Sequence, residues 1–311
     1  MLAEAEVVSS ALLVDGLCKR YGRLLAVDGV GFEVAEGEIF GIIGPNGSGK
    51  TTTAECAQGL RRPDAGRVRI FGIDPHAEPG RMGRLVGTQL QDSTLPDRIR
   101  VGEALHLFAS LASEPVDEAE LLQQWGLWAR RRASFASLSG GQRQRLFVAL
   151  ALVTRPRLVF LDEMTTGLDP AARREAWRLI ERARREGATV VLVTHFMDEV
   201  ERLCDRVAVL VNGRVLDVDT PAGLVARRGS GVSARFAAPD RIDLDGLRRL
   251  PDLVGVSKVD GSVEVRGSGR SLTALGHFLA THGLADTELR VQQPRLEDVY
   301  LELVAGVREE S

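Results

Sequence analysis

Eight consecutive residues in the first fifth of the chain have the composition of a phosphate-binding loop. The pattern G-x-x-x-x-G-K-[ST] is matched at every position by Gly44-Pro45-Asn46-Gly47-Ser48-Gly49-Lys50-Thr51. Glycines let backbone N–H groups approach a phosphate closely, and a helix that starts there adds unpaired donors and partial positive charge. Lys50 can then reach the β- and γ-phosphates, and the Thr51 hydroxyl can bind Mg²⁺. The stretch therefore predicts a nucleotide site.

Polar residues that suit phosphoryl transfer follow two later apolar runs. Asp162 and Glu163 end the run 158–161, and His195 comes directly after the run 189–193. In open α/β sheets, ligands bind at the carboxyl ends of parallel strands. Asp162 is then a candidate to bind Mg²⁺, Glu163 to polarise the attacking water, and His195 to contact the γ-phosphate. In isolation, a carboxylate pair can simply form a turn and a histidine can simply pack, but the upstream loop favours the catalytic interpretation.

A second glycine-rich helix start lies between these segments. Leu138-Ser139-Gly140-Gly141-Gln142 precedes a predicted helix that runs to about residue 154. Ser139 suits the N-cap, and the two glycines expose N–H groups, so this is another anion site. One nucleotide already has its phosphate loop. The second site makes sense if it closes on a nucleotide bound to another copy of the chain.

The elements that must position these residues alternate between strands and helices, which predicts an α/β fold. Lys19-Arg20-Tyr21-Gly22 is expected to be a loop, and Asn212-Gly213 is expected to be a hairpin turn. Strands are predicted at 11–18, 30–34, 38–43, 68–71, 85–90, 158–161 and 189–193, with a hairpin at 206–217. Helices are predicted at 51–60, across 101–134 with breaks near Glu114-Pro115 and Gly126, and at 139–154 and 171–186.

The composition excludes several classes of protein. The 311 residues carry a net charge of −3 and a pI near 6.0, so no overall basic field indicates a nucleic-acid partner. Three cysteines without C-x-x-C spacing indicate a reducing compartment. The N-terminus lacks the basic start of a secretory signal, and the longest apolar run, 146–153, is far shorter than the roughly 20 residues of a spanning helix.

The character of the chain changes after Thr220-Pro221. Residues 227–231 have linker composition, and the remainder carries no site motif. The predicted domains are 1–225 and 226–311, the second being small and α+β. Its expected order is strand 232–238, helix 243–250, strands 253–259 and 262–266, helix 271–283, strand 287–292 and helix 295–304. This βαββαβ order, followed by a helix, suggests a ferredoxin-like topology.

Taken together, these motifs resemble those of the ATP-binding cassette (ABC) ATPases. Residues 44–51 match the Walker A motif, and Leu138–Gln142 match the LSGGQ signature. Leu158–Glu163 match Walker B with its catalytic glutamate, and Gly167-Leu168-Asp169 match the D-loop. LSGGQ together with both Walker motifs is specific to this family, and the resemblance covers about residues 8–225.

The resemblance implies a P-loop fold with a β-sheet core and a helical subdomain at about 92–155, binding ATP and Mg²⁺. Tyr21 falls at the position of the aromatic that stacks on adenine, Gln91 at the Q-loop position, and His195 at that of the switch histidine. The implied catalytic residues are Glu163, His195, Gln91 and Lys50, and the metal ligands are Thr51, Gln91 and Asp162. The implied nucleotide contacts are Tyr21, residues 44–51, Thr52, Ser139, Gly140, Gly141, Gln142 and Asp169.

The resemblance also implies a head-to-tail dimer, most simply a homodimer. Two ATP molecules would lie between Walker A of one copy and LSGGQ of the other, so that Ser139, Gly141 and Gln142 act in trans. One departure from the family pattern is Met164, where proline usually follows the catalytic glutamate. A methionine can pack in that turn, so activity is still expected.

The C-terminal stretch Gln293–Leu303 resembles the ending of ABC-2 type exporter ATPases of the daunorubicin-resistance kind, as do 63–66 and 87–95. The resemblance implies a separate membrane permease, a location at the cytoplasmic face of the membrane, and a drug, lipid or other hydrophobic cargo. The last helix can serve its own domain or help to pair two subunits. A soluble ABC ATPase acting on nucleic acid or ribosomes is the alternative, and it usually has a coiled-coil insertion or two cassettes. A module that only senses ATP is a third hypothesis, against which Glu163 and His195 argue.

Overall fold

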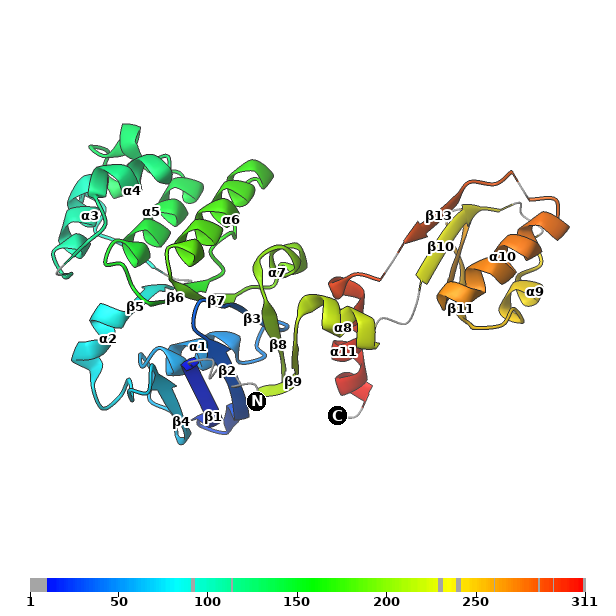
Figure 1. The fold of residues 1–311 in the computed structure, drawn as a ribbon, viewed down its shortest axis with the longest axis horizontal. Helices are drawn as coiled ribbons and strands as arrows, with labels where there is room; N and C mark the ends of the chain where they lie inside the picture. The colour runs from blue at the N-terminus through cyan, green and yellow to red at the C-terminus, as the bar shows by residue number, and fades with distance from the viewer. Residues whose placement is uncertain are drawn as a thin grey trace, which may run out of the picture. The chain divides into compact units, whose positions relative to one another are not determined.

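The computed structural model describes residues 10–90, 93–112, 114–228, 232–238, 242–259, 261–284, 286–292 and 294–309. The chain separates into two compact units, Met1–Pro221 and Ala222–Ser311. Each unit has its own sheets and helices (Figure 1).

The first unit is built on a six-stranded sheet. Its strands, in spatial order, are β5 (Val86–Gln89), β6 (Leu158–Asp162), β7 (Thr189–Val193), β3 (Ile39–Ile43), β8 (Arg206–Val211) and β9 (Arg214–Asp219). All neighbours pair in parallel except β8 and β9, which form a hairpin through Asn212-Gly213 as predicted. Every residue of β3, β6 and β7 is buried, as expected of parallel strands that are covered on both faces. The carboxyl ends of these three strands therefore meet at one edge of the sheet.

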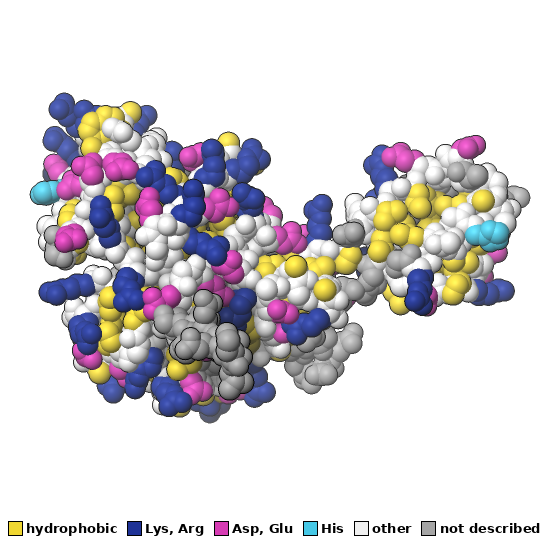
Figure 2. Space-filling model, in the orientation of Figure 1, with side chains coloured by type: hydrophobic (Ala, Val, Ile, Leu, Met, Phe, Trp, Pro, Cys, Tyr) yellow, Lys and Arg dark blue, Asp and Glu magenta, His cyan; other side chains and the backbone are white. Residues whose placement is uncertain are grey.

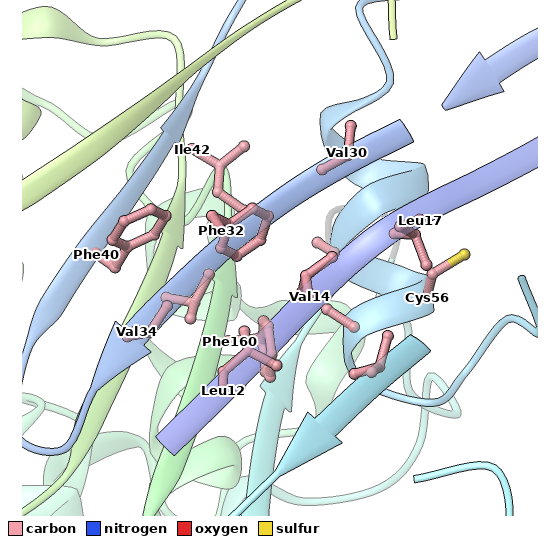
Figure 3. Packing of buried hydrophobic residues seen from close by; sticks show 14 of the residues in the cluster. Leu12, Val14, Leu17, Val30, Phe32, Val34, Phe40, Ile42, Cys56 and Phe160 are labelled. Carbon is pink, nitrogen blue, oxygen red and sulfur yellow. The ribbon is translucent and has the colours of Figure 1, made fainter. Parts of the chain in front are cut away.

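A smaller antiparallel sheet covers this core. Its strands are β2 (Leu24–Ala35), β1 (Ser10–Tyr21) and β4 (Ala65–Ile70), in that order. Figure 3 shows side chains of this sheet, such as Leu12, Val14 and Phe32, packed with Phe160 of the large sheet and Cys56 of α1 (Lys50–Ala57). Because one cluster joins both sheets to α1, the helix that follows the phosphate loop is fixed from two sides.

The predicted elements of this unit need three corrections. The expected loop 19–22 is wrong, since β1 runs to Tyr21 and β2 starts at Leu24. The first helix ends at Ala57, not at residue 60, because Gly59 adopts a positive φ of 83° that ends helices. Leu85, which was predicted to begin a strand, instead ends the helix α2 (Pro79–Leu85), and the strand begins at Val86.

The predicted helical stretch 101–134 is more broken than expected. It holds α3 (Val101–Ala109), α4 (Glu118–Gln124) and a short 3₁₀ turn at Trp128–Arg130. Gly126, at φ 63°, ends α4 as the sequence predicted. The remaining helices of the unit are α2 (Pro79–Leu85), α5 (Gly140–Leu152), α6 (Pro170–Arg185) and α7 (Met197–Leu203). Lys and Arg side chains are interspersed with acidic ones over the face of this unit that Figure 2 shows.

The second unit has the ferredoxin-like arrangement that the sequence predicted. Its four-stranded antiparallel sheet has the order β11-β12-β10-β13, which is the split βαβ order. The elements are α8 (Pro221–Arg228), β10 (Val232–Ala237), α9 (Leu244–Arg248), β11 (Leu253–Val259), β12 (Ser262–Gly267), α10 (Gly269–Thr281), β13 (Leu289–Gln292) and α11 (Leu296–Glu309). Ala234, Phe236 and Val265 of the sheet pack with Leu275 and Phe278 of α10. No helix in the described part of the chain is long and apolar enough to cross a bilayer.

Candidate nucleotide site

The predicted phosphate loop connects the end of β3 to the start of α1. Ser48 lies within it, and its carbonyl accepts a hydrogen bond of 3.0 Å from the N–H of Gly213, in the β8–β9 turn. The carbonyl of Gly213 in turn accepts one of 2.8 Å from the N–H of Asp28 on β2. The loop is therefore held by backbone groups of two neighbouring strands.

Two glycines of the loop are required by close packing. A Cβ on Gly44 would lie 2.1 Å from the carbonyl oxygen of Leu210, and one on Gly49 would lie 2.3 Å from that of Ala26. Gly49 also adopts a φ of 97° at the N-cap of α1, where a side chain is strained. Gly47 has a positive φ of 79°, but nothing lies within 4 Å of its Cβ position.

These contacts predict that alanine has different effects at Gly44 and at a glycine outside the loop. Gly44→Ala should displace the loop and weaken nucleotide binding at least about tenfold, because the backbone of β8 cannot move aside. Gly72→Ala is the matched control outside the loop: Gly72 has a φ of 78° with nothing within 4 Å of its Cβ position, so alanine there should cost only the strain of a positive φ, about 1–2 kcal/mol of the free energy of unfolding. Isothermal titration with ATP and urea unfolding would measure both effects. Equal nucleotide affinity in the two variants would contradict the predicted packing constraint.

Lys50 is buried at the first position of α1. Its ammonium donates hydrogen bonds to the carbonyls of Gly44, at 2.8 Å, and Pro45, at 3.0 Å. Burial lowers the pKa of Lys50, while the charges of Glu163 and Asp162 act in the opposite direction. The ammonium thus lies inside the loop and close to both carboxylates.

Asp162 is the last residue of β6 and is 2% exposed. Burial raises its pKa to about 6, the Thr51 hydroxyl lowers it by hydrogen bonding, and the charge of Glu163 raises it further. Its Oδ1 is buried and accepts no hydrogen bond from the described residues. A buried carboxylate oxygen without a donor, beside a hydroxyl, fits a hard divalent cation such as Mg²⁺. No three His, Cys, Asp or Glu side chains cluster as a metal site in the described ranges.

Glu163 and His195 contact each other across two adjacent strand ends. His195 Nδ1 lies 3.2 Å from Glu163 Oε1, and the Glu163 side chain is 15% exposed. The backbone of Glu163 adopts a φ of 50°, and its N–H donates to the carbonyl of Val193 at 2.9 Å. A non-glycine residue in the left-handed region is strained, and such strain concentrates at functional sites. Met164 is buried in the same turn, as the sequence analysis expected.

The second glycine-rich helix start forms a capping box. Ser139 is the N-cap of α5, and its Oγ accepts a hydrogen bond from the N–H of Gln142. The Gln142 side chain accepts one in return from the N–H of Ser139. Ser139 and Gly140 are exposed. A Cβ on Gly141 would lie 3.2 Å from Leu168, so the start of α5 packs on the turn that precedes α6. Asp169 caps α6 by accepting from the N–H groups of Ala171 and Ala172, which lowers its pKa.

The structure brings most of the predicted residues to one edge of the large sheet. Residues 44–51, with Thr52 on α1, adjoin Asp162 and Glu163, and His195 completes this edge. Tyr21, at the end of β1, is 39% exposed, and the Arg61 guanidinium carbon lies 5.3 Å from its ring centroid. Gln91 lies outside the described residues.

Sequence reasoning missed the groups behind His195. Glu199, Trp177 and Arg173 contact the segment that carries this histidine. Glu199 stands in the acidic run Asp198-Glu199-Val200-Glu201, which has the composition of a solvated helix face. The available signal was that Glu199 lies four residues before the apolar Leu203. Residues i and i+4 share one face of a helix, so Glu199 could have been expected on the buried face.

Comparison with known proteins agrees with this geometry. The family model described as "ABC transporter" matches residues 27–166. The daunorubicin resistance ATP-binding protein DrrA3 of Streptomyces coeruleorubidus is 34% identical, over 97% of this chain and 98% of that protein. The Nod factor export ATP-binding protein I of Ralstonia nicotianae is 36% identical, over 94% of this chain and 93% of that protein.

Solved structures show the same fold. A structure of the ATP-binding subunit of an ABC transporter matches with a TM-score of 0.65 and 30% identity, covering 70% of this chain and 93% of that one. The ADP conformation of another ATP-binding cassette matches with a TM-score of 0.57 and 26% identity, covering 67% of this chain and 90% of that one. Because relatives at 34% and 36% identity span nearly the whole chain, it belongs to the ATP-binding subunits of ABC transporters, the ATPases that couple hydrolysis to transport.

Proposed function

We propose that the chain is the ATPase subunit of an ABC-2 type exporter and acts as a head-to-tail homodimer that closes on two ATP molecules. A separate membrane permease would hold it at the cytoplasmic face of the membrane. The names of the relatives, which refer to daunorubicin resistance and Nod factor export, support a hydrophobic or amphiphilic cargo such as a drug or lipid.

The residues at the sheet edge have distinct proposed roles. The loop 44–51 and Lys50 bind the phosphates, Glu163 polarises the attacking water, and His195 contacts the γ-phosphate and orients Glu163. Thr51, Asp162 and Gln91 would hold Mg²⁺, which neutralises charge on the phosphates when it is bound. Tyr21 would stack on the adenine.

One observation carries the proposal of a composite site. The start of α5 is an exposed anion-binding helix end that packs on Leu168, while the chain's own phosphate loop is built from β3 and α1. The capping box engages the backbone N–H groups of Ser139 and Gln142, so the donors on offer are the N–H of Gly141, the Ser139 hydroxyl and the Gln142 side-chain amide. One nucleotide with its own loop does not require them. In a two-fold dimer they would bind the γ-phosphate on the other subunit, with Asp169 near that interface.

The route to the permease is proposed to run through the helical region. Leu107 in the last turn of α3 is 54% exposed, and Leu111, just after that helix, is 67% exposed. Both follow Gln91 in the chain. Exposed large apolar side chains of this kind mark contact surfaces when they gather. The second unit is proposed as an accessory domain that contributes to subunit pairing.

A mixing experiment tests the composite site. Chains with Lys50→Ala or Ser139→Glu should each be inactive alone, because every site in either homodimer has one damaged half. After mixing and exchange of subunits, half of the dimers pair one variant with the other, and half of their sites are intact. Activity should therefore return to about a quarter of the parent rate if the two sites turn over independently.

The control mixes each variant with itself under the same conditions. Mixed dimers can be verified by carrying different affinity tags on the two variants. If tagged mixed dimers form in ATP but no activity returns, the nucleotide is not shared between subunits and the proposed dimer is wrong.

A further inference from the structure

Glu199 is a buried carboxyl group that no step described so far uses. It lies in the first turn of α7 and is 0% exposed. Acidic side chains are almost never fully buried without partners, since burying a charge is costly. Burial accordingly raises the pKa of Glu199, and the neighbouring Thr194 and Trp177 side chains act in the opposite direction. The fold therefore retains a buried carboxyl of which only Oε1 has a hydrogen-bond donor among the described residues, the indole of Trp177.

These contacts connect α6 to the turn that carries His195. Trp177 of α6 donates its indole N–H to Glu199 Oε1 at 3.1 Å. Thr194 adjoins the same carboxyl and lowers its pKa, and the Oγ1 of Thr194 accepts the N–H of Phe196 at 3.1 Å. The second carboxylate oxygen of Glu199, Oε2, is buried without a hydrogen-bond partner among the described residues. The Glu199 carboxyl thus lies against the residue before His195, and Thr194 in turn holds the backbone of the residue after it.

A cation–π contact and a contact between two rings also connect this turn to α6. The guanidinium carbon of Arg173 lies 4.2 Å from the ring centroid of Phe196, and Phe196 and His195 have centroids 4.1 Å apart. Arg173 also approaches Asp198 at 3.4 Å. Two adjacent turns of α6 therefore contact the segment around His195. Arg173 contacts Phe196, and Trp177 contacts Glu199.

The orientation of the His195 ring depends on these contacts from α6. Its imidazole is 42% exposed and contacts Glu163 at 3.2 Å, so packing on the outside does not fix the ring. The ring is held instead by the backbone from 194 to 196 and by its tilted contact with the Phe196 ring. Displacements of about 1 Å at a site of phosphoryl transfer can cost up to about 100-fold in rate.

We propose that Glu199, with its donor Trp177, is a positioning residue that sets the His195 ring against Glu163. This inference rests on the proposed roles of His195 and Glu163. Through Trp177 and Glu199, the helix α6 is then connected to His195 of the same subunit. Asp169 is the N-cap of that helix. The alternative is that Glu199 only stabilises the fold, with no effect on His195 beyond a loss of folded protein.

The direct test observes His195 in the full-length chain. Side-chain ¹³C–¹H spectra resolve the five histidines, and loss of one signal in His195→Gln assigns it. Trp177→Phe removes the donor to Glu199 and keeps an aromatic ring, so the chain should remain folded. The His195 signal should shift while those of the other four histidines stay. Trp128→Phe, the same change at a 39% exposed tryptophan, is the matched control. An unmoved His195 signal in both Trp177→Phe and Glu199→Ala would overturn the inference.

Measurements of kcat and ATP affinity distinguish a positioning role of Glu199 from a purely structural one. Glu199→Ala should lower kcat about tenfold and leave the affinity for ATP unchanged, because the phosphate loop is not touched. Glu199→Gln keeps an acceptor for Trp177 and should retain most of the parent kcat. If Glu199→Gln loses as much kcat as Glu199→Ala, or if affinity falls with kcat, positioning through the Trp177 contact is wrong. A shifted His195 signal with an unchanged kcat would instead support positioning and contradict the catalytic role of His195.

Discussion

A chain with Glu163→Gln should bind ATP as tightly as the parent and hydrolyse it at least about 100-fold more slowly. The glutamine keeps the shape of the side chain and the contact distance to His195, but it cannot polarise water as a carboxylate does. The positive φ of Glu163 is unaffected, since both residues carry the same strain there. Closed dimers should then accumulate, because the step that opens them is removed. Phosphate release, ATP titration and size-exclusion chromatography with ATP would measure the three effects.

Glu175→Gln is a matched control for this variant. Glu175 lies on α6, is paired with Arg178, and does not contact the site. Its substitution should leave hydrolysis within about twofold of the parent, as for surface changes in general. Hydrolysis by Glu163→Gln at the parent rate would show that another group polarises the water. Slow hydrolysis without a trapped dimer would instead contradict dimer closure.

Asp162→Asn should stabilise the nucleotide-free chain and at the same time remove most Mg²⁺-dependent hydrolysis. The pKa of Asp162 is raised from 3.8 to about 6 by burial, so the folded state holds the proton more tightly than the unfolded state. Ionisation therefore destabilises the fold progressively between about pH 4 and pH 6. Above that window the penalty amounts to about 3 kcal/mol, which asparagine avoids.

Urea unfolding of parent and variant across pH 4 to 8 measures this difference. The free energies of unfolding should nearly coincide near pH 4, and the variant should be the more stable chain above pH 6. The same substitution at exposed Asp97 is the control. A constant difference across the whole range would mean that Asp162 does not ionise in this window. Hydrolysis should fall by at least about 100-fold, because the amide is a poor ligand for Mg²⁺.

Much of the fold was predictable because its signals are local. The fully apolar runs of β3, β6 and β7 lie between clear turns, and Asn212-Gly213 adopts the positive φ values that its composition predicts. The phosphate loop was readable since glycine spacing and Lys50 encode it directly. The ferredoxin-like order of the second unit followed from its alternation of strands and helices.

What the sequence did not reveal depends on contacts between distant segments. The pairing of Trp177 with Glu199 joins residues that are 22 positions apart, and nothing in either local pattern indicates it. Glu163 combines a positive φ with a hydrogen bond from its N–H to Val193 on the neighbouring strand. The packing of Leu168 on Gly141 likewise depends on tertiary structure. Each of these features supports a motif that the sequence did predict.

The attachment of the phosphate loop to its neighbours has a kinetic consequence. Ser48, Gly213 and Asp28 form a chain of backbone hydrogen bonds, and the carbonyls of Leu210 and Ala26 fill the space beside Gly44 and Gly49. The loop is thus preorganised by the protein and does not wait for a ligand to order it. Binding then avoids the entropic cost of ordering a flexible segment. An empty subunit should therefore take up the next nucleotide without a slow step in which the loop first becomes ordered.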